Sequence, residues 1–361
     1  MLEKEQKVLE SFGYHADLSK NLSLPFDVEG TLCFKNQAKF NPLKYILGLS
    51  KSIINKKGQI YTNTIAVDVE KNTKNYVVYT DNDKKIKAKH VIMATRYPFM
   101  NVPGFYFSKL YQATSYIVAI DTKNNPLKDM YINVSSPIYS LRSAKFDGKD
   151  ILLVAGGDCK TGHNSFAENP YDVLINFAKQ FYPDADILYK WSSEDCISLD
   201  KLPYVGKFSN LLPNVYVGTG FKKWGMTLSN VSANLIVDEI CERDNKYAYL
   251  FDSRRFGLFK NFDEVKNMVV DSTNSLLLNK LKSSNSSIEN IQPNSGAIVE
   301  IDGKKVGVYK DIENQIYAIN PICTHLGCLL TWNDIDKTWD CPCHGSRYDA
   351  FGKNLYGPAF K

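Results

Sequence analysis

The sequence lacks any apolar run that approaches the ~18–20 residues needed to cross a bilayer. Its first ten residues are charged and hold no apolar core of the kind found in a secretory signal. It also lacks a block of Lys or Arg, and a net charge of +5 is too small and too dispersed to indicate a nucleic-acid partner. These absences predict a soluble, cytoplasmic protein with no membrane span and no nucleic acid among its partners.

Cysteine is scarce over most of the chain. Four of the eight cysteines stand singly, at Cys33, Cys159, Cys196 and Cys241, whereas the other four lie within residues 323–344 together with two of the five histidines. In a cytosolic chain, such a cluster indicates a metal site before it indicates a framework of disulfides.

The chain has 361 residues, which is enough for about two domains. Residues 1–250 are predicted to mix helices and strands, because some segments have helical apolar spacing and others are rich in β-branched and aromatic residues. The predicted helices are residues 37–54, with Asn41-Pro42 as N-cap and first position, and residues 228–242. The predicted strands are residues 59–70, 75–81, 85–95, 131–134, 151–155 and 214–219.

The last third of the chain has a different pattern. Residues 251–289 are helical and polar and end in a crowd of Ser, Asn, Pro and Gly, which is typical of a linker. Residues 290–361 are predicted to be all-β, with a hairpin turn at Asp302-Gly303 and a further strand over residues 315–320. Both Cys/His segments fall between strands.

The clustered residues form two similar groups. Cys323 and His325 are separated by one residue, and Cys341 and His344 by two. Two loops that each offer a thiolate and an imidazole can close round a metal centre from opposite sides. A single tetrahedral zinc is one candidate, because two Cys and two His are an ordinary zinc ligand set. Zinc leaves the remaining two cysteines of the cluster without a role.

The motifs C-T-H-L-G-C and C-P-C-H-G-S-x-Y-D resemble the Rieske iron–sulfur domain of cytochrome bc-type complexes. The ligands that this resemblance implies are Cys323 and Cys341 for one iron of a [2Fe–2S] cluster, and His325 and His344 for the other. A disulfide would join Cys328 to Cys343. Replacing two thiolates by neutral imidazoles removes negative charge, so such a cluster accepts electrons more readily than an all-cysteine centre.

The same resemblance gives roles to residues near the ligands. Ser346 and Tyr348 stand where the higher-potential type of the domain has hydroxyls that donate to a bridging sulfide and to a ligand cysteine sulfur. Gly357-Pro358-Ala359 resembles the loop that covers the cluster. The two imidazoles would form the exposed face of the cluster, through which electrons leave.

Five segments of residues 1–250 resemble, in their order, the flavoproteins related to glycine oxidase and D-amino-acid oxidases. They are QAKFNPLKYILGL, GQIYTNTIAVDVE, KHVIMATR, SLDKLPYVG and NVYVGTGFKKWGMTLS. The resemblance implies that Val67 contacts the adenine half of FAD and that Ala94 and Thr95 lie at a strand end beside the dinucleotide. A glycine-rich run into the next helix would supply backbone amides to the flavin and pyrophosphate. The residues of that run are Gly218, Gly220, Trp224, Gly225, Met226 and Thr227.

Three features depart from the flavoprotein pattern. No G-x-G-x-x-G occurs among the 21 glycines, so we expect the N-terminal unit that anchors the FAD pyrophosphate to be missing, in a fragment, a split-gene product or a protein that has lost this anchor. Arg96 stands where a Gly is usual. Asp195 lies five residues before Asp200, where amino-acid oxidases have an Arg that binds the substrate carboxylate, so an amino-acid substrate is disfavoured.

Together the resemblances predict a mixed α/β remnant of an FAD/NAD(P)-binding-type flavoprotein domain over 1–250, a linker over 251–289 and an all-β Rieske domain over 290–361. The predicted function is that of an oxidoreductase in which FAD exchanges electrons between an unidentified small-molecule substrate and the cluster. The catalytic residues are unknown; Arg142 and His163 are candidates, but each also fits an ordinary surface position.

Two alternatives remain. One is an electron carrier, in which the Rieske module sits on a flavoprotein remnant that no longer binds FAD and docks only a redox partner protein. The other is a zinc-bound interaction module, with Cys and His ligands and no redox role.

Overall fold

The computed structural model describes residues 1–20, 22–123, 127–163, 167–255 and 287–359. The chain forms two compact units that do not follow sequence order. Unit 1 comprises Met1–Ile60, Ser115–Asp158 and Phe166–Ser193, and unit 2 comprises Tyr61–Thr114, Cys159–Ser165 and Glu194–Lys361. The chain crosses between the two units at residues 114–115, 158–159 and 193–194, and each of these positions lies inside a long strand.

Unit 1 contains helices, a small sheet and most of a five-stranded sheet. Its helices are α1 (Leu2–Ser11), α2 (Pro42–Asn55) and α3 (Pro170–Phe181). The small sheet pairs β1 (Asp17–Ser19) with β2 (Thr31–Cys33). The large sheet has the order β11 (Asp186–Ser198), β7 (Leu110–Asp121), β10 (Lys149–Lys160), β9 (Tyr139–Phe146) and β8 (Met130–Ile132).

The start of α2 follows from its sequence. The Asn41 side chain accepts a hydrogen bond from the N–H of Lys44 at 3.1 Å, and Pro42 occupies the first turn. The helix predicted within residues 37–54 is therefore confirmed: it begins at Pro42 after the predicted N-cap Asn41, and it ends at Asn55, before the expected end at Gly58.

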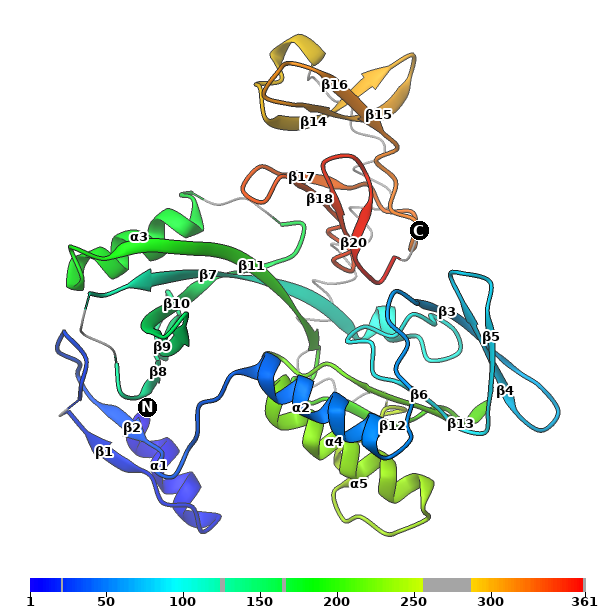
Figure 1. Ribbon diagram of the computed structural model, residues 1–361, viewed down its shortest axis with the longest axis horizontal. Coiled ribbons are helices and arrows are strands. Elements are labelled where there is room, and N and C mark those ends of the chain that lie inside the picture. The colour runs from blue at the N-terminus through cyan, green and yellow to red at the C-terminus, as the bar shows by residue number, and fades with distance from the viewer. Residues whose placement is uncertain (21, 124–126, 164–166, 256–286, 360–361) are drawn as a thin grey trace. The chain divides into compact units, whose positions relative to one another are not determined.

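In unit 2, a parallel strand pair forms the centre of one sheet. β6 (Val91–Met93) lies parallel to β13 (Leu212–Thr219), which pairs on its other side with β12 (Tyr204–Ser209). The helix α4 (Gly225–Ile240) follows β13 and packs against β12 and β13, and α5 (Ala248–Phe251) comes next (Figure 1). The helix predicted over residues 228–242 is confirmed and begins three residues earlier, at Gly225.

A second sheet of unit 2 consists of β3 (Ala66–Lys71), β4 (Tyr76–Thr80) and β5 (Lys85–Ala88). The prediction of a single strand over residues 85–95 is wrong. The chain breaks between β5 and β6 because β5 pairs with β4, whereas β6 pairs with β13 in another sheet. Residues 89 and 90 separate the two strands, so the chain enters the second sheet as a new strand.

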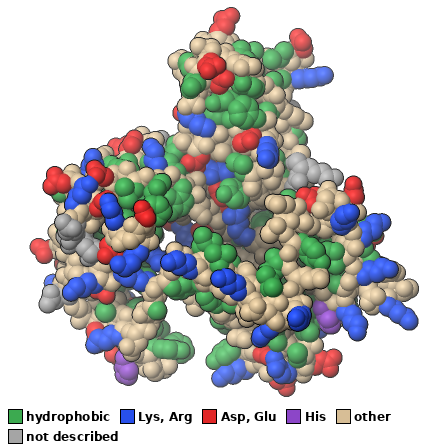
Figure 2. Space-filling view, viewed as in Figure 1, with side chains coloured by type: hydrophobic (Ala, Val, Ile, Leu, Met, Phe, Trp, Pro, Cys, Tyr) green, Lys and Arg blue, Asp and Glu red, His purple; other side chains and the backbone are tan. Residues whose placement is uncertain are grey.

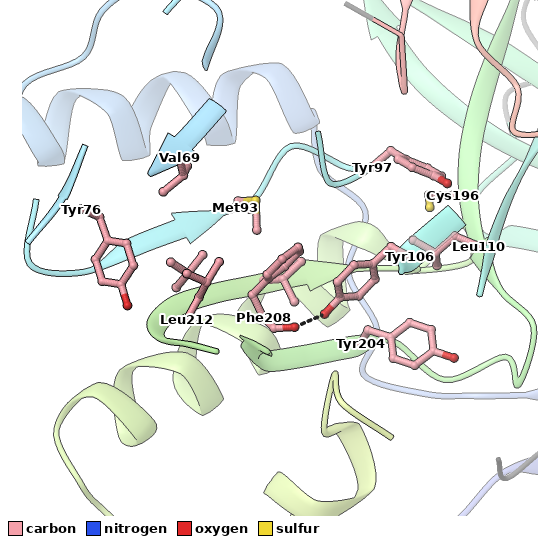
Figure 3. Close-up of a cluster of buried hydrophobic side chains, with 12 residues drawn as sticks. Val69, Tyr76, Met93, Tyr97, Tyr106, Leu110, Cys196, Tyr204, Phe208 and Leu212 are labelled. Carbon is pink, nitrogen blue, oxygen red and sulfur yellow. Dashed lines mark hydrogen bonds between the residues drawn. The ribbon is translucent and has the colours of Figure 1, made fainter. Parts of the chain in front are cut away.

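A cluster of buried side chains forms a core of unit 2 around these strands (Figure 3). Tyr106, in the short 3-10 helix η1 (Tyr106–Ser108), stacks on Phe208 with ring centroids 5.1 Å apart, and its hydroxyl donates to the Phe208 carbonyl at 3.3 Å. Met93 at the end of β6 and Tyr97 just beyond it are both buried. The core thus extends into the segment that follows β6.

The C-terminal residues of unit 2 form two small antiparallel sheets. After the 3-10 helix η3 (Ile288–Asn290), the strands are β14 (Ser295–Ile301), β15 (Lys304–Lys310) and β16 (Ile316–Ile319), then β17 (Thr331–Asn333), β18 (Thr338–Asp340), β19 (Arg347–Asp349) and β20 (Asn354–Tyr356). Asp302 and Gly303 make the two-residue turn between β14 and β15, with φ of 50° and 71°, as a type I′ hairpin requires.

The predicted fold class, a mixed α/β part followed by a β-rich part, is confirmed. Residues 256–286 of the predicted linker lie outside the described residues. On the face shown in Figure 2, Lys and Arg are scattered among acidic and uncharged side chains. Within the described ranges, no helix is both long and apolar enough to span a membrane.

Candidate metal centre and cofactor site

Two tight loops, one after β16 and one between β18 and β19, carry the clustered Cys and His residues. In the first loop, the Cys323 N–H donates to the carbonyl of Cys328 at 2.8 Å, and the Gly327 N–H donates back to Cys323 at 3.0 Å. The matching bonds of the second loop, from Cys341 and Gly345, measure 2.8 and 2.9 Å. The two glycines have φ of 74° and 77°, which other residues adopt only with strain. The same backbone turn therefore shapes both loops.

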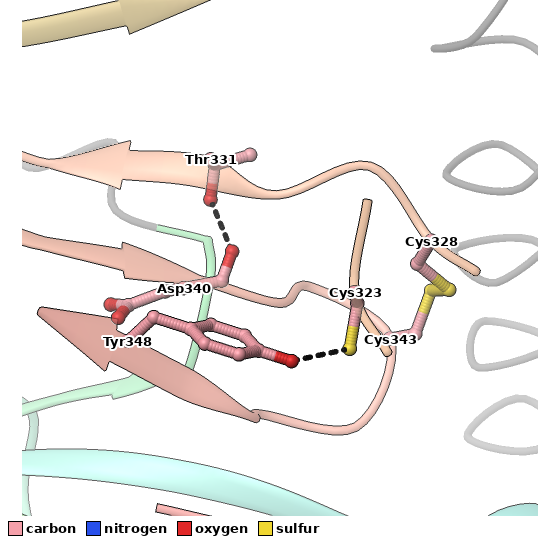
Figure 4. Close-up of a disulfide and its surroundings, with 6 residues drawn as sticks. All are labelled: Cys323, Cys328, Thr331, Asp340, Cys343 and Tyr348. Carbon is pink, nitrogen blue, oxygen red and sulfur yellow. Dashed lines mark hydrogen bonds between the residues drawn. A yellow bond between two sulfur atoms is a disulfide. The ribbon is translucent and has the colours of Figure 1, made fainter. Parts of the chain in front are cut away.

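A disulfide between Cys328 and Cys343 joins the two loops (Figure 4). The Cys341 sulfur lies within 4.8 Å of both disulfide sulfurs. These three cysteines do not make a metal site together, because disulfide sulfurs are not thiolates. The free cysteines of the two loops are Cys323 and Cys341.

These two free thiols are buried and close together. Their hydrogen bond to each other lowers the pKa of Cys323 to about 6 and raises the pKa of Cys341. Cys323 can therefore lose its proton near neutral pH. Holding both sulfurs as thiolates inside the protein requires positive charge beside them, because an unpaired buried charge is costly. A bound iron would supply that charge.

His325 and His344 face each other, with ring centroids 4.9 Å apart. In each ring, Nδ1 is buried and has no hydrogen-bond partner among the described residues. Burial lowers the pKa of His325 to about 4 and that of His344 to about 3, so both rings are neutral at pH 7. A neutral imidazole is the form that binds a metal, and a buried polar atom without a partner calls for an explanation.

The other side of each ring contacts residues of unit 2 that precede the Cys/His loops by more than 200 positions. His325 Nε2 lies 2.7 Å from Asn101 Oδ1. His344 hydrogen-bonds the backbone of Phe107, and its ring lies edge-on to the Phe107 ring at 6.2 Å. Both contacts come from residues 97–112, which we call the histidine-facing segment. The two Nδ1 atoms are therefore the ones left for a metal.

Two hydroxyls lie beside the Cys323 sulfur. The Tyr348 hydroxyl is 3.5 Å from this sulfur (Figure 4). It is also 3.2 Å from the Thr324 hydroxyl. Ser346 is fully buried, hydrogen-bonds the same thiol and thereby helps to lower its pKa. The Ser346 oxygen accepts the N–H of Ala359 at 3.0 Å, and Ala359 belongs to the loop expected to cover the site. Both hydroxyls are thus placed to stabilise negative charge on sulfur.

The donor set fits a Rieske [2Fe–2S] cluster: two buried thiols, two neutral imidazoles with unpaired Nδ1 atoms, and hydroxyls beside a sulfur. The expectation that the imidazoles form an exposed face is wrong for His344, which is only 5% exposed. The reason is the histidine-facing segment, which packs against the rings.

Gln112 attaches this segment to the second loop. Its buried amide donates to the carbonyls of His344, Gly345 and Gly357 at 3.3, 2.9 and 2.6 Å. A Cβ added to Gly345 would lie 2.6 Å from the Gln112 Cβ, so a larger residue would push the loop away. The close approach depends on glycine.

A buried charge network links β19 to β11. Arg347 is 3% exposed and forms ion pairs with Glu194 at 2.5 Å, Asp336 at 2.7 Å and Asp340 at 2.9 Å. Burial raises the pKa of Glu194, and the positive charge of Arg347 opposes this shift. The network therefore depends on Arg347 to compensate several buried carboxylates.

Several predicted FAD contacts lie at the carboxyl ends of the parallel strands. Ala94 and Thr95 follow β6 directly and are exposed. Met93 pairs with Val217, and Ala94 and Gly218 are the next residues after this pair in their two segments. Ligands of α/β proteins commonly bind beyond this end of parallel strands.

The remaining predicted contacts lie between β13 and α4. Gly220 has φ of 76°, which suits the sharp turn out of the strand. Trp224 is the N-cap of α4, with Gly225, Met226 and Thr227 in its first turn, and no side chain of the described residues caps this end. Uncapped amides at a helix N-terminus favour negatively charged ligands.

Val67 lies at a bulge in β3. The pairing with β4 passes from Ala66–Thr80 to Asp68–Tyr79 and omits Val67. A bulge leaves one residue out of the ladder, which is common beside binding sites.

Arg96 has φ of 63°, a left-handed conformation in which Gly is usual. Its side chain donates to the Glu194 carbonyl at 2.9 Å, and its guanidinium lies 5.2 Å from the centre of the Tyr356 ring. The replacement of Gly by Arg thus adds contacts to β11 and to the C-terminal part of unit 2.

The other candidate residues do not gather at one place. Asp200 forms a bidentate ion pair with Arg255 at 2.6 and 2.9 Å. Asp195 is half-buried on β11, and His163 is exposed in the turn after β10. Arg142, in unit 1, donates to the Phe40 carbonyl at 3.1 Å. A catalytic base is not evident among the described residues.

Comparison with protein families gives two matches. The FAD dependent oxidoreductase family matches residues 2–239, and the Rieske [2Fe-2S] domain matches residues 285–361. The chain belongs to the FAD-dependent oxidoreductase family and carries a C-terminal Rieske [2Fe–2S] domain, as the sequence predicts.

The protein is similar to YhfW of Bacillus subtilis (strain 168), named as a Rieske 2Fe-2S iron-sulfur protein. The two are 35% identical over 357 residues, which are 99% of this chain and 70% of YhfW. A second relative is the cytochrome b6-f complex iron-sulfur subunit 1 of Nostoc sp. (strain PCC 7120). It is 58% identical over 45 residues, which are 12% of this chain and 25% of that subunit.

Among solved structures, the fold is similar to glycine oxidase from Geobacillus kaustophilus, with a TM-score of 0.61, 15% identity and 71% of each chain covered. It is also similar to L-amino acid deaminase from Proteus vulgaris with the deletion of the specific insertion sequence, with a TM-score of 0.57, 16% identity, and coverage of 70% of this chain and 68% of that one. At these identities the similarity concerns the fold alone.

Sequence analysis missed the residues from distant segments that contact the imidazoles and the second ligand loop. Asn101, Phe107, Gln112 and Glu194 belong to none of the motifs and lie far from the ligand loops along the chain. Arg347 stands inside the second motif, and only the structure reveals its partners.

Proposed function

We propose that this protein is an oxidoreductase in which a bound flavin and the Rieske cluster exchange electrons between a small-molecule substrate and a redox partner. In this proposal Cys323 and Cys341 hold one iron of the cluster, and His325 and His344 hold the other. FAD would supply two-electron exchange with the substrate, and the cluster single-electron exchange.

The observation that carries the proposal is the placement of the histidine-facing segment. This segment follows β6 and the predicted FAD contacts Ala94 and Thr95 directly, and it covers the imidazoles. Tyr97 connects the two places: its N–H donates to the Thr95 carbonyl at 2.7 Å, and its ring lies edge-on to the His325 ring at 6.2 Å. Tyr97 and His344 are buried, which favours electron exchange through the protein over exchange with solvent at these two side chains.

The substrate in this proposal is not held by a carboxylate clamp of the amino-acid oxidase kind, since Asp195 stands where the Arg is expected. An acidic side chain repels a carboxylate. The proposed substrate class is therefore a small molecule other than an ordinary amino acid.

Absorption spectra and metal content of the purified chain, before and after addition of FAD, test this proposal. We expect iron with acid-labile sulfide, a Rieske spectrum and flavin absorbance, followed by bleaching of the cluster when the flavin is reduced without oxygen. A cluster without any flavin would support a pure electron carrier instead. A colourless protein with stoichiometric zinc would contradict both.

The ligand assignment has its own test. His344→Ala removes one imidazole of the site, so the electron paramagnetic resonance signal of a reduced Rieske cluster should disappear. His15→Ala is a control, because His15 is exposed and belongs to the other compact unit, so the signal should stay intact. Survival of the signal in His344→Ala would refute the assignment.

A further inference from the structure

Asn101 contacts a predicted iron ligand from a distant part of the chain. Its amide oxygen lies 2.7 Å from His325 Nε2, across a sequence separation of 224 residues. The Asn101 carbonyl accepts the N–H of Phe105 at 2.8 Å, which fixes the turn that carries the side chain. This backbone hydrogen bond therefore fixes the position from which the Asn101 side chain reaches His325.

The contact selects one form of the His325 ring. An amide oxygen accepts hydrogen bonds and cannot donate them, so the proton of the neutral ring lies on Nε2. Nδ1 then keeps its lone pair, and this atom is buried without a partner among the described residues. The ring is thus prepared to bind iron through Nδ1 before any iron arrives.

We propose that Asn101 is a positioning residue for the cluster, which holds His325 as an Nδ1 ligand and lowers the reduction potential of the cluster. A ligand imidazole that donates its outer N–H to an acceptor becomes a stronger electron donor to the metal. Stronger donation stabilises the oxidised irons more than the reduced ones. A stronger hydrogen-bond acceptor at position 101 therefore lowers the reduction potential of the cluster, and a weaker one raises it.

Asn101 is the suitable place to test this idea, because His344 is held differently. The hydrogen bond of His344 goes to the backbone of Phe107, which a substitution does not remove. At His325 the acceptor is a side chain. Changing Asn101 alters the acceptor of one ligand and leaves that of the other in place.

The test compares Asn101→Ala, which removes the acceptor, with Asn101→Asp, which keeps its shape and strengthens it. We measure the reduction potential of the cluster at one fixed pH, the g-values of the reduced cluster and the iron content. We expect the potential to rise in Asn101→Ala and to fall in Asn101→Asp, with altered g-values in both.

Asn354 provides matched controls within the β20 strand, because its amide donates to the nearby Tyr356 carbonyl at 3.2 Å. Asn354→Ala should leave the potential unchanged, and Asn354→Asp should lower it less than Asn101→Asp does. If Asn101→Asp leaves both the potential and the g-values unchanged, the proposal is overturned. This result alone is sufficient, even where Asn101→Ala assembles no cluster. The measurement needs the cluster alone, so its outcome does not depend on whether a flavin exchanges electrons with it.

Discussion

Around Cys323, individual hydroxyls are placed to adjust the charge of the sulfur. Tyr348 reaches this sulfur from β19, and Ser346 reaches it from the second loop. A hydroxyl beside a thiolate donates its proton, and the bond strengthens as negative charge on the sulfur grows. Each hydroxyl should therefore favour the reduced cluster.

Tyr348→Phe tests whether the Tyr348 hydroxyl raises the reduction potential, because it removes a single oxygen atom. The variant keeps the buried ring and loses the hydroxyl 3.5 Å from the Cys323 sulfur, so we expect a cluster with a lower reduction potential. A hydrogen bond to a charged group contributes about 1.5–3 kcal/mol. Because this bond is present in both oxidation states, only the difference in its strength changes the free energy of reduction, by on the order of 1 kcal/mol. Spectroelectrochemistry measures the shift.

Tyr317→Phe is the control for this substitution. Tyr317 packs in the same C-terminal core, and its hydroxyl contacts Asp311 instead of a ligand sulfur. Its loss should leave the potential unchanged. Equal shifts in the two variants would mean that the Tyr348 hydroxyl does not act on the sulfur.

At the scale of elements, the hairpin between β14 and β15 shows how a short sequence determines a turn. Asp302-Gly303 was predicted to make this turn, and it does, because both residues adopt the positive φ of a type I′ turn. The break between β5 and β6 was not predicted, since nothing local to residues 85–95 shows that two strands join different sheets.

Gly303→Ala should destabilise the protein by about 1–2 kcal/mol, which is the approximate cost of the left-handed conformation for a residue with a Cβ. Added Cβ atoms at Gly303 and at Gly48 both meet open space, so sterics do not differ between the two sites. Gly48 lies within α2, where the same substitution should stabilise by about 0.5–1 kcal/mol.

Denaturant unfolding measures both changes. Opposite signs at the two sites are the expected result, because the backbone conformation differs while the space around the side chain does not. A neutral Gly303→Ala variant would contradict the assigned turn.

At the scale of the whole molecule, the two compact units are assembled from discontinuous segments. Unit 2 combines the C-terminal β-sheets with the sheet of β6, β12 and β13, and it includes the Arg347–Glu194 ion pair. Glu194 lies on β11 and Arg347 on β19, 153 residues apart in sequence. This pair and the Gln112 hydrogen bonds hold the Rieske loops against the rest of unit 2.

Arg347→Ala should cost about 3–5 kcal/mol of stability, because it leaves buried carboxylates without their cation. Glu194→Gln is a milder variant that keeps the shape and one acceptor, and it should cost less. Thermal and denaturant unfolding measure both. Lys123→Ala is the control, since Lys123 pairs with Asp186 at an exposed site, where ion pairs contribute about 0–1 kcal/mol. Similar losses for Arg347→Ala and Lys123→Ala would contradict a structural role of the buried network.

The sequence alone determined the parts of this protein that depend on neighbouring residues. The two Cys/His loops are contiguous motifs, their glycines permit the tight turns, and the family resemblances follow from short segments in a fixed order. The predicted helices α2 and α4 likewise follow from local caps and spacing.

Only the tertiary structure decided what surrounds the imidazoles. Asn101 and His325 are 224 residues apart, and Gln112 and Gly345 are 233 apart, so no local pattern pairs them. The expectation of an exposed histidine face failed for this reason, because burial depends on which distant segment packs on a loop. Hydrogen bonds between remote segments form only when the fold brings them together, and here they connect the candidate cluster site to the flavoprotein part of unit 2.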